Sequence, residues 1–431
     1  MNFSPEISQN THEGILDMQG KLLKETIQYV YKNSDYYRTA LDKSGVRPED
    51  INGIPDIRKL PITSKEDFQK DNWAFLCVPK RKIAEVVSTT GTTGHPIFNA
   101  MTESDLERLA ENERRSFSLV GVTNNDLFQI TVTLDNLFVA GIAYYRGLMK
   151  LGVGVIRIGP NNPKRQLEIM KKFRPTGIIA VPSFMLSIYK EAEKEGIKPE
   201  NITFKKAILI GESIRNKDLS SNALGEMLSQ KNSGVKCYST YGITEAAIAF
   251  CECHSSCGFH SHSDLVFAEI LDNEGNQVKE GEIGELALTT FKVEGMPLVR
   301  YRTGDMTFKT TKRCNCGTFS PRIGPILGRK AHKLKIKGTT IYPKAIENAL
   351  LGIESVENYV IEAHSEDDLS DQMVVTVGSQ DRSESFKQLI CENIKAKARV
   401  TIQVKIVSPS EVNKILYENG RRKPRIFIDR R

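Results

Sequence analysis

Residues 86–97 read VVSTTGTTGHPI, and the run from Ser88 to Gly94 consists entirely of Ser, Thr and Gly. The run follows the apolar, strand-like stretch IAEVV at residues 83–87. Backbone N–H groups of glycines can approach an anion closely, and Ser and Thr hydroxyls add further donors. The run therefore predicts a phosphate-binding loop behind a strand. It lacks the spacing of a Walker A loop, and on composition alone a solvated turn is the alternative.

The segments that follow this loop alternate between strand-like and helix-like patterns. Strands are expected at 126–133, 152–159, 177–182 and 205–213, with helices between them at 137–150, 163–175 and 184–196. This alternation indicates βαβ units and a mainly parallel sheet. Short strands and turns follow from about residue 265. We therefore expect an α/β fold, with a large N-terminal domain of mixed sheets and helices at 1–328 and a small mobile α+β domain at 329–431.

The composition excludes several classes of protein. The chain has 431 residues, of which 39% are apolar and 26% charged, as in folded domains rather than disordered chains. It contains no apolar run long enough for a membrane helix and does not begin like a secretory signal, so a cytoplasmic protein without a membrane partner is expected. The net charge of +7 comes without a nucleic-acid motif, so we expect no nucleic-acid partner.

Five short motifs resemble, in order, the signatures of the adenylate-forming enzymes, which include acyl-CoA synthetases, luciferases and peptide-synthetase adenylation domains. They are STTGTTGHP (88–96), YGITE (241–245), YRTGD (301–305), GRKAHKLKIKG (328–338) and RRKPRIFIDRR (421–431). The N-terminal stretch YVYKNSDYYRTALDKSG and the ending IDRR are similar to the phenylacetate–CoA ligase family. A chance match of five motifs, in the right order and over nearly the whole chain, does not explain this resemblance.

This resemblance implies an ATP-dependent acid–CoA ligase. The carboxylate of an acid, aryl or arylacetic as phenylacetate is, attacks the α-phosphate of ATP, which gives an acyl-adenylate and pyrophosphate. The thiolate of coenzyme A then takes the acyl group and releases AMP. Dimers are common in this branch, so a homodimer is expected by analogy. Two alternatives stay open, namely an enzyme that loads the acyl group onto a carrier protein and a nucleotide-binding homologue without turnover.

The resemblance also implies roles for individual residues. Lys423, carried by the C-terminal lid domain, would contact the α-phosphate and the carboxylate. Thr244 would donate to the α-phosphate, and Glu245 would ligate Mg²⁺, a hard ion that prefers oxygen ligands. The other implied nucleotide contacts are Ser88, Thr89, Thr90, Gly91, Thr92, Thr93 and Gly94 for the phosphates, Gly211, Glu212, Ser213, Tyr241 and Gly242 for the base, and Asp305 and Arg329 for the ribose.

Four positions depart from the family pattern. His95 replaces the usual Lys of the phosphate loop, and Arg422 replaces the Gly before the catalytic lysine. Ala331 replaces the hinge Asp, which places the pivot at Lys330 or Ala331. Asp135 stands where aryl-acid members carry a Tyr, and an Asp in the acyl pocket would face a polar or amine-bearing acid. The walls of that pocket are expected at about 135–145 and 211–250.

The cysteines are concentrated in two stretches, CECHSSCGFHSH (251–262) and RCNCG (313–317). A Cys-x-Cys turn followed by Gly presents two thiolates to one ion, and tetrahedral Zn²⁺ takes four sulfur or nitrogen ligands. Spacing alone does not choose among the candidates, and packed free thiols are the alternative. Relatives in the branch with matching residues imply a structural Zn²⁺ site at Cys253, His260, Cys314 and Cys316. The competing ligands are Cys251, His254, Cys257 and His262.

Overall fold

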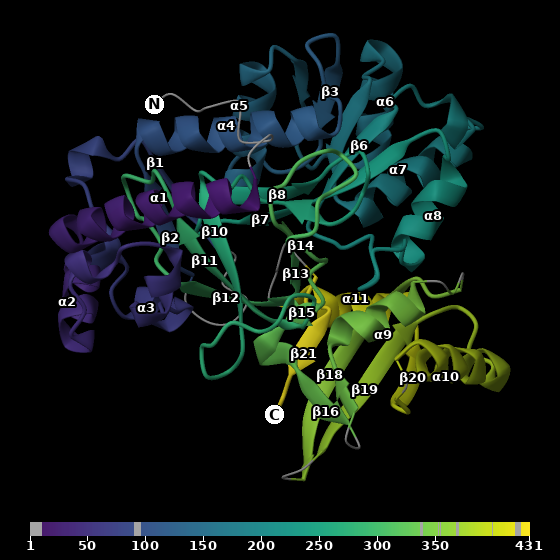
Figure 1. The fold of residues 1–431 in the computed structure, drawn as a ribbon. Helices are drawn as coiled ribbons and strands as arrows, with labels where there is room; N and C mark the ends of the chain where they lie inside the picture. Colours follow the sequence, from purple (N-terminus) through teal and green to yellow (C-terminus); the bar gives the residue numbers. More distant parts are fainter. Residues whose placement is uncertain are drawn as a thin grey trace. The chain divides into compact units, whose positions relative to one another are not determined.

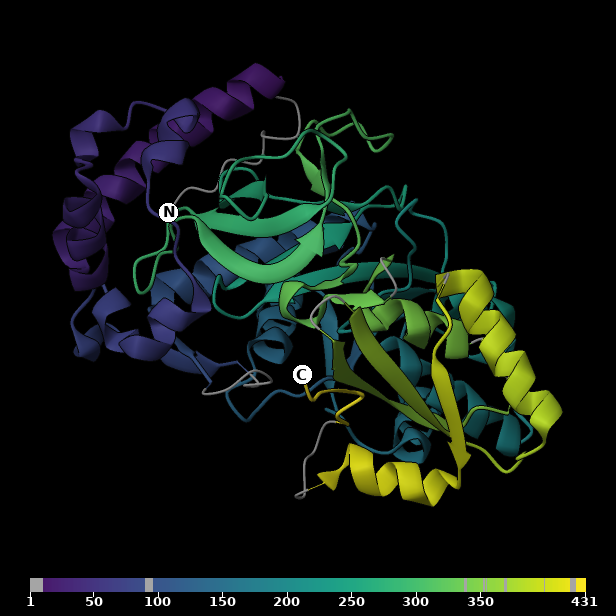
Figure 2. The same ribbon diagram turned by 90° about the horizontal axis from the view of Figure 1, so that it is seen from below.

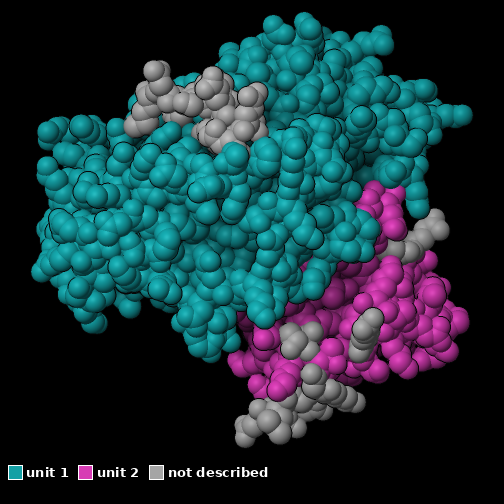
Figure 3. Space-filling view, in the orientation of Figure 1, with its two compact units in different colours: residues 1–220, 228–303, 307–325 teal, residues 221–227, 304–306, 326–431 magenta. Residues whose placement is uncertain are grey.

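The computed structural model describes residues 11–89, 96–336, 339–351, 353, 355–367, 370–398, 400–418 and 424–431 (Figure 1). The chain divides into two compact units (Figure 3). Unit 1 comprises residues 1–220, 228–303 and 307–325, and unit 2 comprises residues 221–227, 304–306 and 326–431. Within the described ranges, no helix is both long and apolar enough to cross a bilayer.

The helices and strands up to residue 323 lie in unit 1, except that α8 and β12 include residues of both units. In chain order they are α1 (His12–Asn33), α2 (Asp35–Ser44), α3 (Lys65–Lys70), β1 (Glu85–Ser88), β2 (Phe98–Met101), α4 (Glu103–Leu119), β3 (Leu127–Ile130), α5 (Val139–Lys150), β4 (Gly154–Arg157), α6 (Pro163–Phe173), β5 (Gly177–Ala180), α7 (Pro182–Lys194), β6 (Lys206–Ile210), α8 (Ala223–Lys231), β7 (Lys236–Ile243), β8 (Ile248–Glu252), β9 (Phe259–His260), β10 (Val266–Leu271), β11 (Gly284–Thr290), β12 (Tyr301–Thr307), β13 (Lys309–Thr310) and β14 (Arg322–Ile323).

The main sheet of unit 1 runs in the order β13-β14-β9-β8-β7-β6-β5-β3-β4. Neighbours from β4 to β7 are parallel, and neighbours from β7 to β13 are antiparallel. The predicted α/β fold with βαβ units is therefore confirmed. The strands end earlier than predicted, since Gly159 after β4 and Gly211 after β6 take left-handed backbone angles, with φ of 65° and 87°.

Alternation along β3 explains why helices cover both faces of this sheet. Phe128 and Ile130 are fully buried in a cluster with Phe117 of α4 and Tyr144 of α5. Gln129 points to the other face, where its side-chain amide donates to the side-chain oxygen of Gln166 in α6 at 2.7 Å. Successive strand residues point to opposite faces, so one short strand fixes a helix layer on each side.

Helix α4 begins with a capping box, in which Thr102 and Asp105 exchange hydrogen bonds. Its Arg108 is fully buried and donates to the carbonyl oxygens of Phe291, Ala247 and Leu265, at 2.6 to 3.1 Å. These carbonyls belong to three separate connections of unit 1. A buried guanidinium satisfied in this way holds the turn after β7 against α4.

Strands β1 and β2 form an antiparallel hairpin, with Glu85 opposite Met101 and Ser88 opposite Phe98. The hydroxyl-rich run from Ser88 begins at the end of β1, as predicted. The chain returns as a second strand before α4 starts, so the run connects two strands of one hairpin. Residues Thr90 to His95 lie outside the described residues.

Unit 2 has its own sheet and core. Its elements are β15 (Gly328–Arg329), β16 (Leu334–Ile336), β17 (Thr339–Ile341), α9 (Pro343–Leu350), β18 (Asn358–Asp367), β19 (Ser370–Gly378), α10 (Glu384–Ala398), β20 (Gln403–Val407), α11 (Pro409–Leu416) and β21 (Phe427–Asp429). The sheet order is β20-β19-β18-β21, and Figure 2 shows this green-to-yellow part from below. Ile361 of β18 packs with residues of α9 and α10, whereas Val360 packs with Val412 and Leu416 of α11, so helices cover both faces.

Candidate nucleotide, acid and metal sites

The motif YGITE occupies the end of β7 and the turn after it. Parallel pairing places Thr240 of β7 beside Ile210, the last residue of β6, so Gly211 leaves the sheet next to Tyr241, which continues β7 opposite Phe250 of β8. The side-chain amide of Asn99 in β2 donates to the carbonyl oxygens of Glu245 at 3.0 Å and Thr244 at 3.4 Å. The hairpin that carries the hydroxyl-rich loop is therefore tied directly to the second motif.

The third motif also reaches Glu245. The Tyr301 hydroxyl, on a side chain that is 1% exposed, donates to the Glu245 carboxylate at 3.1 Å. Because this donor is fixed in the core, it restricts the orientation of the Glu245 carboxylate. Hydrogen-bond partners commonly orient metal ligands in this way. Tyr301 was not singled out from the sequence, and its place at the start of YRTGD was the available signal.

We expect Tyr301→Phe to raise the Mg²⁺ concentration needed for half-maximal adenylation about tenfold, because Glu245 loses its orienting donor. A titration of pyrophosphate release against Mg²⁺ measures this. Tyr31→Phe is the matched control, since the Tyr31 hydroxyl bonds Asp42 on an exposed helix surface. An unchanged Mg²⁺ requirement would show that Tyr301 does not position the carboxylate.

The side chains of the motif GES, residues 211–213, are engaged with the protein. The Glu212 carboxylate accepts hydrogen bonds from the backbone N–H of Ser183 at 2.9 Å and from its hydroxyl at 2.8 Å, near the start of α7. The Ser213 hydroxyl donates to the carbonyl oxygen of Arg215 at 3.1 Å. An adenine here would therefore meet chiefly the backbone of this segment and the ring of Tyr241, which is half-buried.

The two described residues of the predicted phosphate loop bond to each other and to Ile97. The Ser88 hydroxyl donates to the carbonyl oxygens of Thr89 and Ile97 at 3.2 Å, and the Thr89 hydroxyl accepts from the Ile97 N–H at 3.2 Å. The other predicted members of the loop, Thr90, Gly91, Thr92, Thr93 and Gly94, lie outside the described residues.

The predicted ribose contacts meet within unit 2. Asp305 of β12 pairs in register with Arg329 of β15, and the Arg329 Nε lies 3.3 Å from the Asp305 carboxylate. The Asp305 side chain is largely buried, whereas Arg329 is 45% exposed. A buried carboxylate beside an exposed guanidinium suits the two hydroxyls of a ribose. The hydroxyls can donate hydrogen bonds to the carboxylate and accept them from the guanidinium.

Lys423 lies outside the described residues, but the chain after it is anchored. Strand β21 pairs in parallel with β18, Ile361 opposite Phe427. The guanidinium of Arg431 donates to the carbonyl oxygens of Ala331 at 3.3 Å and Lys333 at 3.0 Å. The last residues of the chain are thus tied to the segment that contains the predicted hinge position.

A cavity in unit 1 adjoins the second motif. Both predicted walls contribute to it. Helix α4, which was not among the predicted walls, contributes as well. Its lining includes Leu109, Glu113, Phe138, Tyr144, Gly242 and Thr244. The space open to the centres of water-sized molecules is about 60 Å³, whereas one water needs roughly 10–15 Å³. Asp135, which was expected in the acyl pocket, is exposed and does not line this cavity.

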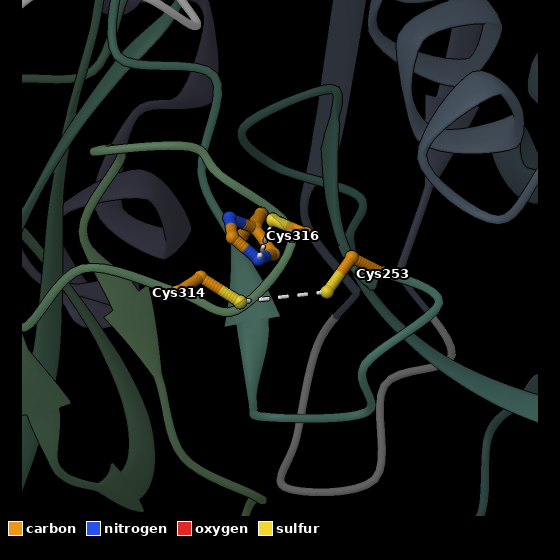
Figure 4. Close-up of side chains that lie close together, drawn as sticks. Cys253, Cys314 and Cys316 are labelled. Carbon is orange, nitrogen blue, oxygen red and sulfur yellow. Dashed lines mark hydrogen bonds between the residues drawn. The ribbon is translucent and has the colours of Figure 1, made fainter.

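Four of the cysteine and histidine candidates come together in unit 1. The ligand atoms of Cys253, His260, Cys314 and Cys316 all lie within 4.8 Å of one another. The Cys253 and Cys314 sulfurs are 3.6 Å apart, and the Cys316 sulfur is 3.6 Å from Nε2 of His260. Figure 4 shows Cys314 and Cys316 on one loop facing Cys253 on another.

The donor set fits a zinc ion. Ligand atoms around tetrahedral zinc lie about 3.8 Å apart when the bonds are about 2.3 Å long. Nδ1 of His260 lies 2.8 Å from the Ser320 hydroxyl, which leaves Nε2 for the ion, as in known zinc sites. The pairing of Arg322 in β14 with His260 in β9 brings the two loops together.

The competing ligands lie elsewhere. Cys251 is buried in the cluster between α4, α5 and the sheet, and His254 is exposed. The Cys257 thiol donates to the carbonyl oxygen of Ser255 at 3.0 Å. His262 lies with Nε2 3.2 Å from the Ser116 hydroxyl, and burial lowers its pKa to about 4.

Comparison with known proteins identifies the family of this chain. A family model for AMP-binding enzymes matches residues 26–293, and one for the AMP-binding enzyme C-terminal domain matches residues 338–431. Phenylacetate-coenzyme A ligase of Thermus thermophilus is 30% identical over 95% of this chain and 96% of that protein. Phenylacetate-coenzyme A ligase of Aromatoleum evansii is 27% identical over 99% of this chain and 96% of that protein. A crystal structure of 2-hydroxyisobutyryl-CoA ligase with a bound adenylate superposes with a TM-score of 0.85, at 20% identity over 99% of this chain and 92% of that one.

The chain belongs to the AMP-binding family of adenylate-forming enzymes. Its curated relatives within that family are phenylacetate–CoA ligases, so the resemblance seen in the sequence motifs is confirmed, and with it the class of AMP-forming acid–thiol ligases. ATP and coenzyme A are the cosubstrates of that class, and Mg²⁺ is its general metal ion.

Proposed function

We propose that this protein activates a small aryl or arylacetic acid with ATP and transfers the acyl group to coenzyme A, releasing pyrophosphate and AMP. The observation that carries the proposal is the position of Thr244. It lines the cavity, and its carbonyl oxygen accepts a hydrogen bond from Asn99 of the hairpin that bears the predicted phosphate loop. A carboxylate entering this cavity therefore meets the predicted α-phosphate contact.

The barrier to adenylation is the approach of one anion to another, so the residues act mainly by position and charge. The cavity orients the acid, and the Thr244 hydroxyl donates to the α-phosphate. Glu245, oriented by Tyr301, holds Mg²⁺, which neutralises phosphate charge. Asp305 and Arg329 bind the ribose, and the Lys423 ammonium offsets the charge that builds between carboxylate and phosphate.

The other predicted features serve the same reaction. Residues 329–431 act as a lid domain that brings Lys423 to the nucleotide. Cys253, His260, Cys314 and Cys316 bind a structural Zn²⁺, which joins the loop after β8 to the loop before β14. The enzyme works in the cytoplasm, as expected from the sequence. It works as a homodimer, by analogy with the branch.

Pyrophosphate release with a panel of acids tests the function. The panel holds phenylacetate, anthranilate-type aryl acids and alkyl acids, each with ATP and Mg²⁺ and with or without coenzyme A. At least one aryl or arylacetic acid is expected to give acid-dependent pyrophosphate, and addition of coenzyme A to give AMP and a thioester. Pyrophosphate release from none of the acids would reject the proposed function. Thioester formed only with a loaded carrier protein would reject coenzyme A as acceptor.

A further inference from the structure

Glu113 is an acidic residue at a core position of helix α4. Leu106, Leu109 and Phe117 of the same helix are buried at spacings that place them, with Glu113, on one face. The Glu113 residue is 2% exposed. An apolar residue at this position would fill the core at lower cost, because burying a carboxyl is unfavourable unless it is paired.

The carboxyl of Glu113 has little to satisfy it in the protein. One of its oxygens accepts a hydrogen bond from the side-chain amide of Asn112 at 3.2 Å. Among the described residues, no Lys, Arg or His forms an ion pair with it. Burial raises the pKa of Glu113 to about 8. A carboxyl kept largely protonated in this way can both donate and accept a hydrogen bond.

Glu113 also lines the cavity that Gly242 and Thr244 line. Tyr144 of α5 lies beside it, with its hydroxyl buried close to Glu113 and Thr240. The rest of the lining is mainly apolar, from residues such as Leu109 and Phe138. An apolar pocket with a few converging polar groups is the usual form of a small-molecule site, in which those groups decide which ligand fits.

We propose that Glu113, together with Tyr144, is a specificity-determining residue that recognises a hydroxyl or amino group on the acid. The substrate class is then an aryl or arylacetic acid with a hydrogen-bond donor on its side chain, in preference to the unsubstituted acid. This inference rests on the proposed function for the position of the acid's carboxylate. A site built around a buried polar group discriminates strongly against a ligand that leaves the group unpaired.

The test compares phenylacetate and benzoate with their hydroxy- and amino-substituted forms, on wild type, Glu113→Gln and Glu113→Leu. Wild type is expected to favour a donor-bearing acid at least about tenfold in kcat/KM. Glu113→Leu is expected to lose that preference, mainly through a raised KM for the donor-bearing acid. Glu113→Gln keeps the shape and the acceptor oxygen and should fall between the two.

Glu107→Gln is the matched control, because Glu107 lies on the exposed side of the same helix and pairs with Lys150. Acid binding is also measured by calorimetry without ATP, which separates this inference from the proposed function. Selective binding of donor-bearing acids that Glu113→Leu abolishes supports the inference even if no pyrophosphate is released. Equal binding of both kinds of acid to wild type, or an equal loss for both in Glu113→Leu, overturns it.

Discussion

Lys423→Ala is expected to lower the rate of acid-dependent pyrophosphate release about a thousandfold, while ATP still binds within about threefold of wild-type affinity. The reason is that the ammonium acts where the charges of carboxylate and α-phosphate meet, whereas binding of the nucleotide depends on many contacts that stay intact. Single-turnover adenylation and ATP titration by calorimetry measure the two quantities.

Lys414→Ala is the matched control for this variant. Lys414 is an exposed lysine of α11, in the same unit and shortly before Lys423 in the chain, so its loss changes the net charge equally. If the rate of pyrophosphate release falls by the same small factor in both variants, Lys423 acts only through the net positive charge of the unit. If Lys423→Ala loses ATP affinity along with rate, it is a binding residue and the mechanism above is wrong.

The central fold could be predicted because its signals are local. The strands and helices between residues 126 and 213 alternate with clear periods, and Asn162 and Thr102 cap the helices that follow them. Strand ends were less predictable. Gly211 continues an apolar run in the sequence, and only its left-handed backbone ends β6.

The metal cluster shows where the resemblance added to the sequence pattern. Spacing in residues 251–262 allows several ligand sets, because a loop can turn any of its cysteines inward. The choice is made by tertiary pairing. His260 lies in β9 next to β14, which brings Cys314 and Cys316 to it, whereas His262, two residues further, is held at Ser116.

The cavity beside Thr244 shows what a family pattern can miss. Asp135 was chosen because it replaces a Tyr, but the backbone of the next residues, Asn136 and Leu137, is left-handed and Asp135 is exposed. Glu113 could have been found from the sequence, because it is a charged residue on the apolar face of an amphipathic helix. Which side of α4 faces a cavity depends on the packing of α5 and β7, which no local pattern contains.

Loss of the metal is expected to have the second large effect, on stability. Cys314→Ser should reduce the zinc content from about one ion per chain to nearly none and lower the apparent Tm by on the order of 10 °C. The site joins two loops that carry little other regular structure, and this variant leaves the Cys253 and Cys316 sulfurs and the His260 imidazole close together without an ion. Metal analysis of the purified protein and a thermal scan measure both effects, and chelator treatment of wild type should reproduce the shift.

Cys257→Ser is the control that makes this result specific. Cys257 belongs to the same loop as Cys253, but its thiol bonds the Ser255 carbonyl instead of facing the cluster. It should therefore keep full zinc and the wild-type Tm. Because a closed shell of four protein ligands leaves no position for substrate, pyrophosphate release by the chelated enzyme should persist below its lowered Tm. Immediate loss of activity at a temperature where the fold is intact would make the metal catalytic, and wild-type zinc in Cys314→Ser would place the ion among other ligands.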